Sequence, residues 1–152
     1  MKKTFLIVLI LFLSGCGYSS IYKDQKFQDF QINITNMYGD NEFNNLIKNQ
    51  LTLYSNINSE KKYYLIINSN FKKIDITKNS SGVTSDFKLS ILTNINVKFN
   101  GKNKNFQFKE IINIKNNTNS FEQKNYERNV KRNFASSIRE KLIIEILSIN
   151  DN

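Results

Sequence analysis

Four stretches of the chain alternate apolar and polar residues, as β-strands with one buried face do. The clearest is 87–99, where every odd position except Thr93 is apolar. The same alternation predicts strands near residues 30–35, 62–76 and 106–114. The second of these slips out of alternation at Lys72-Lys73, which predicts a bulge there. Asn100-Gly101 tolerates positive φ and predicts a tight hairpin between the last two strands.

Two further segments have helical spacing. Asp40 can cap a helix, and apolar residues follow it at steps of three or four from Phe43 to Tyr54. Ser120 and Gln123 form a capping box ahead of a long helix that runs to about Ile149. The last turns of that helix are apolar over a wide arc that includes Ile143, Ile144 and Leu147. Either the core covers a second surface there, or the helix end lies in an interface.

The predicted order is therefore strand–helix–strand–strand–strand–helix. This order favours an α+β two-layer sandwich, in which two helices cover one face of a four-stranded, mostly antiparallel sheet. The other face is polar and must meet water or a hydrated partner surface. Its expected residues are Lys88, Asn94, Asn96, Lys98, Gln107, Lys109 and Asn113.

The N-terminus has the parts of a secretory signal peptide. Met1-Lys2-Lys3 precedes a short apolar run, and Leu13-Ser14-Gly15-Cys16 has the form of a bacterial lipobox. We therefore expect a signal peptide over residues 1–15, a lipidated tether over 16–26 that begins at Cys16, and a single domain over 27–150. The alternative is an ordinary signal peptide in which the cysteine is incidental.

The amino-acid composition limits which catalytic and metal sites the chain could form. The sequence contains no histidine, and Cys16 is its one cysteine. Hydrolytic sites combine a base, a nucleophile and an orienting group, and zinc sites draw on histidine and free cysteine. The acidic residues show no compelling pairing. We therefore expect no enzymatic activity, no metal and no cofactor, apart from acyl chains on Cys16.

The formal net charge is +9. A basic excess is typical of proteins that bind nucleic acid, an anionic membrane surface or a phosphorylated ligand. Export argues against nucleic acid. A functional basic patch and a solvated, lysine-rich surface both remain open, because lysine is frequent along the whole chain.

Three segments carry a resemblance to a known family. Cys16-Gly17-Tyr18-Ser19-Ser20-Ile21-Tyr22 resembles the C-G-Y-x-P-L-Y start of the lipopolysaccharide-assembly lipoprotein family, LptE, with Ser20 in the place of the proline. The segment 82–89 resembles the opening of that family's third strand, and 134–142 resembles its C-terminal helix, with bulkier side chains. The predicted order of strands and helices is also that of the family.

The resemblance implies an outer-membrane lipoprotein, anchored through Cys16 on the periplasmic face, that catalyses no reaction. Similar proteins plug the lumen of the large outer-membrane β-barrel LptD, help to assemble it, and bind lipopolysaccharide on its way to the cell surface. Gly17 after the lipidated cysteine also favours the outer membrane. The alternative is another periplasmic lipoprotein, either a lipid carrier or a structural subunit of a different envelope complex.

A lipopolysaccharide ligand would present phosphates, which lysines hold through charge-assisted hydrogen bonds. The candidate ligands are Lys72, Lys73 and Lys78, at the end of the second strand, and Lys88, just past the following loop. If these two strands pair, the four side chains gather near one end of the sheet. The competing interpretation is a solvated turn. A second basic cluster on the final helix is expected to be an exposed face, and consists of Lys124, Arg128, Lys131 and Arg132.

Overall fold

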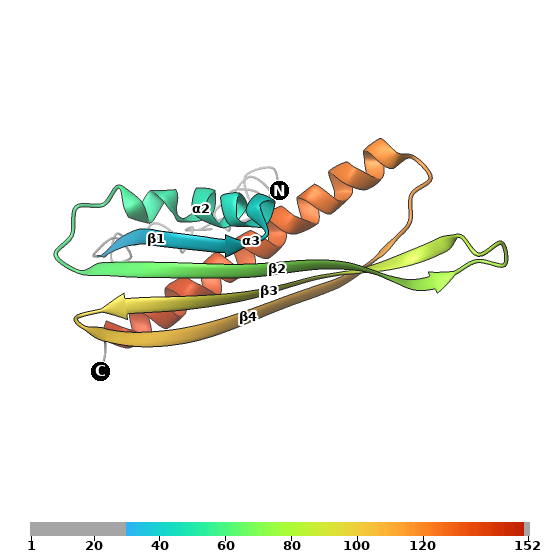
Figure 1. The fold of residues 1–152 in the computed structure, drawn as a ribbon. Helices are drawn as coiled ribbons and strands as arrows, with labels where there is room; N and C mark the ends of the chain where they lie inside the picture. The colour runs from blue at the N-terminus through green and yellow to red at the C-terminus, as the bar shows by residue number, and fades with distance from the viewer. Residues whose placement is uncertain (1–29, 151–152) are drawn as a thin grey trace, which may run out of the picture.

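A computed structural model describes residues 30–150, and Figure 1 shows how their elements are arranged. The predicted signal peptide, Cys16 and the tether lie outside the described residues. In chain order, the elements are β1 (Gln31–Gly39), α2 (Asn41–Ser55), β2 (Lys62–Lys78), β3 (Thr84–Phe99), β4 (Lys102–Lys115) and α3 (Ser120–Asn150).

The four strands form one sheet in the order β1-β2-β3-β4. β1 pairs with β2 in parallel because α2 carries the chain back between them, whereas β2, β3 and β4 pair antiparallel. Both helices pack on the same face of this sheet. The predicted α+β two-layer sandwich with a mostly antiparallel sheet is thereby confirmed. In the described part of the chain, no helix is both long enough and apolar enough to cross a bilayer.

The core lies between this face and the helices. Odd positions of β2 and β3 point inward, and their registers align Leu65 with Val97 and Ile67 with Ile95. Even positions of β4 complete the face, so that Phe108 lies beside Thr93. The even positions of β2 and β3 and the odd positions of β4 make up the opposite, outer face. Its cross-strand polar pairs include Asn94 with Gln107 and Asn96 with Asn105.

The junction between β1 and α2 is held by polar contacts. The carboxylate of Asp40 accepts a hydrogen bond from the Phe43 amide at 2.7 Å, as the capping prediction requires. The buried Asn44 side chain donates to the Tyr38 carbonyl at 2.9 Å and accepts from the Ser69 hydroxyl at 2.7 Å. These bonds fix the first turn of α2 to the end of β1 and to the middle of β2.

The long helix α3 differs from its prediction at the start. Asn119, not Ser120, is the capping residue, and its side-chain oxygen accepts from the Phe121 amide at 3.0 Å. Gln123 instead accepts from the Asn117 amide at 2.8 Å, which ties the helix to the preceding loop. Asparagine is at least as good a cap as serine, so the preceding residue takes the role.

At the other end of α3, the structure shows what covers the wide apolar arc. Leu142, Ile143 and Ile146 are buried in the core, and Leu147 packs partly against it. Ile144 is 67% exposed. The first interpretation, a second covered surface, therefore accounts for all of this arc except one side chain.

Candidate functional site

At one end, the sheet extends beyond the helices that pack on it. β1 stops at Gly39, opposite Ser69, whereas β2 continues to Lys78 and pairs with β3 from Thr84 onward. We call residues 72–88, which comprise the last part of β2, the turn and the start of β3, the hairpin end. In Figure 1 the tip of this hairpin projects beyond both helices. The pairing is regular at Lys72-Lys73, so the bulge predicted there is wrong, and the register shifts instead around Thr77.

Polar side chains, not a core, hold the hairpin end together. The Asn79 side chain accepts from the Ser81 and Val83 amides at 3.0 and 2.9 Å and thereby shapes the turn. The Thr84 hydroxyl donates to Asp75 at 2.8 Å. These bonds connect the two strands near the turn, where the hairpin extends beyond the helices.

Asp86 also makes hydrogen bonds within the hairpin end. Its carboxylate accepts hydrogen bonds from the hydroxyls of Thr77 and Ser85. These two bonds, with a smaller contribution from the charge of Lys115, hold the pKa of Asp86 below its usual value. The Asp86 carboxylate is therefore engaged in hydrogen bonds within the hairpin, where it links β3 to the end of β2.

Apolar side chains of the hairpin end are exposed. Ile74 is 50% exposed, Ile76 42% and Val83 56%. Isolated exposed apolar residues are ordinary on protein surfaces, but a group of them on a projecting tip is typical of a site that meets a partner or an amphiphile.

The structure separates the four predicted lysines. Lys72 and Lys88 both lie on the outer face, where Lys72 is opposite Ser90 and Lys88 is opposite Ile74. Diagonal neighbours of this kind are about 7–8 Å apart, close enough for two ammonium groups to share one phosphorylated ligand. Lys78 ends β2 and faces Thr84 across the hairpin. These three lysines belong to the same hairpin as the exposed apolar side chains.

Lys73 lies on the opposite face of the sheet, beneath α3. Its ammonium donates to Glu127 at 2.6 Å and sits 3.8 Å from the centre of the Phe87 ring. Strand alternation requires this separation, because adjacent residues point to opposite faces. In this structure Lys73 joins α3 to the sheet and stands apart from Lys72 and Lys88.

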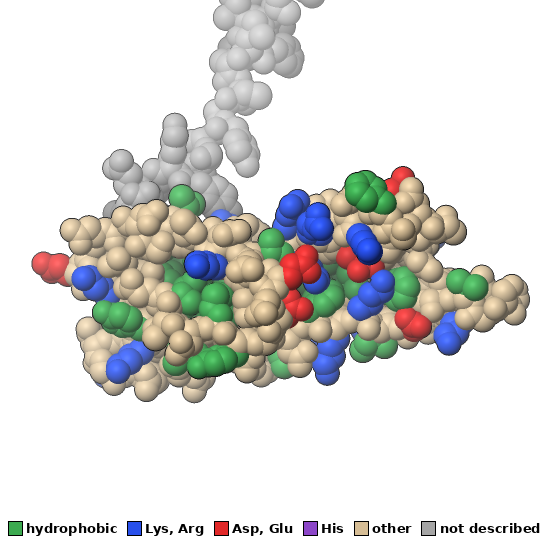
Figure 2. Space-filling view, turned by 45° about the horizontal axis from the view of Figure 1, so that its top comes forward, with side chains coloured by type: hydrophobic (Ala, Val, Ile, Leu, Met, Phe, Trp, Pro, Cys, Tyr) green, Lys and Arg blue, Asp and Glu red, His purple; other side chains and the backbone are tan. Residues whose placement is uncertain are grey.

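The basic cluster predicted on α3 is also divided. Lys124, Arg128 and Arg132 are exposed, as expected. The side chain of Lys131, however, is only 12% exposed, and its ammonium bonds Glu42 of α2 and lies 4.3 Å from the centre of the Phe71 ring. Figure 2 shows basic and acidic side chains close together on one face of the molecule. Lys131 therefore joins both helices to β2.

Glu127 is the acidic partner at this crossing. Burial opposes its ionisation, but hydrogen bonds from Lys73 and Gln123 and the charges of Lys73 and Lys131 lower its pKa below the ordinary value. Because the pKa is lower in the folded state, the ionised side chain stabilises the fold above the ordinary carboxylate pKa. This stabilisation is lost as the pH falls through the lowered value.

We therefore expect acid to weaken the contact between α3 and the sheet. After solvent screening, the free energy of unfolding should fall by about 0.5–1 kcal/mol more between pH 6 and pH 3 in the wild type than in Glu127→Gln. Urea unfolding at both pH values measures this difference. An identical pH dependence in the two proteins would show that Glu127 makes no such contribution.

Comparisons with known proteins agree on the fold. No protein-family model matches the sequence, and no curated protein matches it significantly. Solved structures do match, among them three lipoproteins at 7–14% sequence identity. Rare lipoprotein B from Shewanella oneidensis superposes with a TM-score of 0.57 at 12% identity, over 78% of this chain and 99% of that chain.

Two other lipoproteins are similar in the same way. A minor lipoprotein from Acinetobacter baumannii matches with a TM-score of 0.51 at 14% identity, over 78% of this chain and 92% of that chain. Lipoprotein B from Nitrosomonas europaea matches with a TM-score of 0.51 at 7% identity, over 82% and 88%. At these identities the likeness shows a shared fold. The resemblance drawn from the sequence is confirmed to that extent.

Proposed function

We propose that this protein is an LptE-type outer-membrane lipoprotein that binds lipopolysaccharide and plugs and helps to assemble an LptD-like β-barrel. The fold is shared with rare lipoprotein B, which belongs to the LptE family. The observation that carries the proposal is the hairpin end, where exposed aliphatic side chains and lysines occur together on that fold.

The ligand's chemistry suits this surface. Lipopolysaccharide joins phosphates to acyl chains, so a binding surface must offer both charge-assisted donors and apolar area. Lys72, Lys78 and Lys88 supply the donors, and Ile74 and Val83 supply part of the apolar area. Because the side chains are exposed, phosphate binding needs little rearrangement of the protein.

The triple substitution Lys72→Glu, Lys78→Glu and Lys88→Glu should therefore reduce lipopolysaccharide affinity by at least about tenfold, since it replaces attraction by repulsion at each phosphate contact. Binding of labelled lipopolysaccharide to the purified protein measures the effect. Lys73→Glu, tested separately, is expected to lower stability, because Lys73 is engaged with Glu127.

A matched control reverses three lysines at the far end of the sheet, Lys98, Lys102 and Lys104. The control carries the same change in net charge, so its affinity should stay within about twofold of the wild type. Equal losses of affinity in the two triple variants would show that only the overall charge matters, and would contradict the hairpin end as the binding site.

The outer face of the sheet suits the proposed position inside a barrel. Its centre carries asparagine and glutamine side chains that bond across strands, at 2.9 Å between Gln107 and Asn94 and at 2.6 Å between Asn96 and Asn105. A barrel lumen is polar and hydrated, so such a face can lie there without a large desolvation cost.

Copurification tests the partner and the anchor together. The tagged full-length chain should be labelled by palmitate at Cys16, fractionate with outer membranes and bring down a large β-barrel. Cys16→Ser should lose the label and most of the membrane association, because the acyl chains supply the apolar anchor. Recovery of the acylated protein in a soluble periplasmic complex without a barrel would favour the alternative, a lipid carrier or subunit of another envelope complex.

A further inference from the structure

The strand β4 forms an open edge of the sheet. It pairs with β3 along Lys102–Lys115, and in residues 30–150 no strand pairs with its other side. Alternate backbone N–H and C=O groups along such an edge lack a strand partner, which makes the edge a template for another extended chain. The hairpin end, in contrast, offers a surface of side chains.

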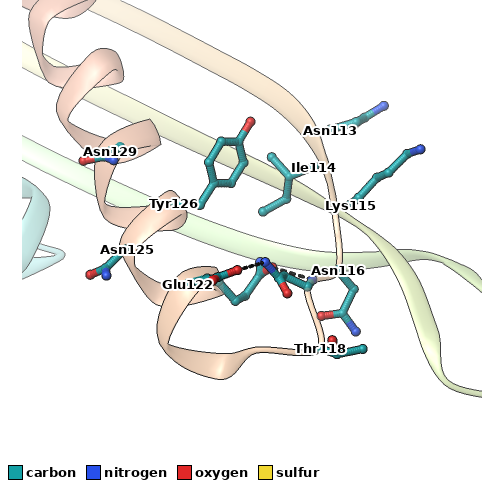
Figure 3. A pocket seen from close by; sticks show the side chains of 11 residues that line it. Asn113, Ile114, Lys115, Asn116, Thr118, Glu122, Asn125, Tyr126 and Asn129 are labelled. Atoms are coloured by element: carbon teal, nitrogen blue, oxygen red, sulfur yellow. Dashed lines mark hydrogen bonds between the residues drawn. The ribbon is translucent and has the colours of Figure 1, made fainter.

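A groove runs between the last part of this edge and the first turns of α3. It has a volume of about 870 Å³ and is lined by Ile114 on one side and by Tyr126 and Asn129 on the other. Figure 3 shows Ile114 and Tyr126 pointing toward one another, whereas Lys115 points away from the helix. Tyr126 is 50% exposed, so the groove leaves apolar surface open beside the edge.

Side chains along this part of β4 differ between the two faces. On the outer face, Lys109 and Lys115 stand at either end of the segment, six positions apart. On the helix face lie Ile112, which is 37% exposed, and Ile114, which is buried. A strand added to this edge would therefore meet lysines at both ends of the outer face, with Ile111 and Asn113 between them, and isoleucine and Tyr126 on the helix face.

The charged residues along β4 determine what kind of strand could bind to its open edge. The one carboxylate in the sequence of β4, Glu110, already accepts from Lys141 at 2.6 Å and from the Ser137 hydroxyl at 2.8 Å. In the groove, Glu122 accepts from the Asn117 side chain at 2.8 Å. Lys109 and Lys115 have no such carboxylate beside them in β4. Lys115 does lie opposite Asp86 of β3, but that carboxylate accepts hydrogen bonds from Thr77 and Ser85. Lys109 and Lys115 would repel a second copy of this edge and attract acidic residues.

We propose that the edge Lys109–Lys115, together with the groove beside it, binds an extended acidic polypeptide segment as a fifth strand of the sheet. The segment carries carboxylates on the outer face, opposite Lys109 and Lys115, and apolar side chains on alternate positions, against Ile112 and Tyr126. Main-chain hydrogen bonds supply affinity, and the alternating side chains supply register. The site adjoins the proposed lipopolysaccharide contacts, because Lys88 lies opposite Asn113 of β4. Its test therefore uses a peptide and no lipid.

The probe is a fluorescein-labelled seven-residue peptide, EVTVTVE, which places its two acids on one face and its valines on the other. Anisotropy measures its binding to the full chain purified in mild detergent. The charge-swapped peptide KVTVTVK should bind at least about tenfold more weakly. Hydrogen exchange of backbone amides in 109–115 should slow when EVTVTVE is added, because edge amides gain hydrogen-bond partners.

The double variant Lys109→Glu/Lys115→Glu should weaken binding of EVTVTVE by about tenfold, whereas the matched variant Lys98→Glu/Lys102→Glu should leave it within about twofold. The substituted side chains are exposed, so both variants should keep the fold, which circular dichroism checks. Equal binding of the two peptides, equal losses in the two variants, or exchange protection outside 109–115 would each overturn the proposal.

Discussion

Replacing Gly39 with alanine is expected to destabilise the protein by about 4 kcal/mol or more, a loss typical of severe backbone conflict. Gly39 ends β1 with φ of +91°, and an added Cβ would lie 1.8 Å from the carbonyl oxygen of Ser69. That carbonyl also accepts the Asp40 amide at 3.0 Å. The contact is with backbone, so no side-chain rotation relieves it. Urea unfolding measures the loss.

Two other glycines provide a control for this result. Gly82 and Gly101 both have φ of +77°, but an added Cβ at either position would meet no atom within 4 Å. Gly82→Ala and Gly101→Ala should therefore cost only the strain of a left-handed backbone, about 1–2 kcal/mol. If Gly39→Ala were no more destabilising than these, the close packing of β1 on β2 at this point would be refuted.

The fold could be predicted because its signals are local. Alternation along 87–99 marks both the strand and its buried face, and Asn100-Gly101 fixes the turn to the next strand, where both residues have positive φ. The Asp40 cap was likewise predicted, because capping depends on residues three positions apart. Helical spacing from Phe43 to Tyr54 then placed α2 between the first two strands.

The candidate site could be predicted only in part. The pairing of β2 with β3 as a hairpin, which the sequence predicts, places Lys72, Lys78 and Lys88 on one hairpin. The separation of Lys73 from Lys72 was missed, although alternation alone puts adjacent residues on opposite faces. The expected bulge at Lys72-Lys73 obscured this signal, since a bulge there would have reset the faces.

Contacts between distant segments left no signal in the sequence. Lys131 and Glu42 are 89 positions apart, and their pairing depends on how α2 and α3 lie across the same strand. The exposure of the hairpin end also depends on how two segments pair, because β1 ends at Gly39 whereas β2 continues to Lys78. Charge runs on a helix do not show which lysine the tertiary structure will cover.

The second large effect is expected in the C-terminal half of α3. Leu142 is fully buried in the core, so Leu142→Ala removes apolar contacts and leaves a cavity. The expected loss is about 3 kcal/mol, within the range for leucine truncation in protein cores. Urea unfolding at constant pH measures it, and an unchanged slope with denaturant would show that the unfolded state is unaffected.

Ile144, two residues further along, is the matched control because it is 67% exposed. Ile144→Ala should change the free energy of unfolding by no more than about 0.5 kcal/mol, and equally at low and high protein concentration. A larger, concentration-dependent loss would mean that this side chain is covered by a second molecule in solution. The interface interpretation of the apolar arc would then apply at Ile144, although Leu142, Ile143 and Ile146 face the core.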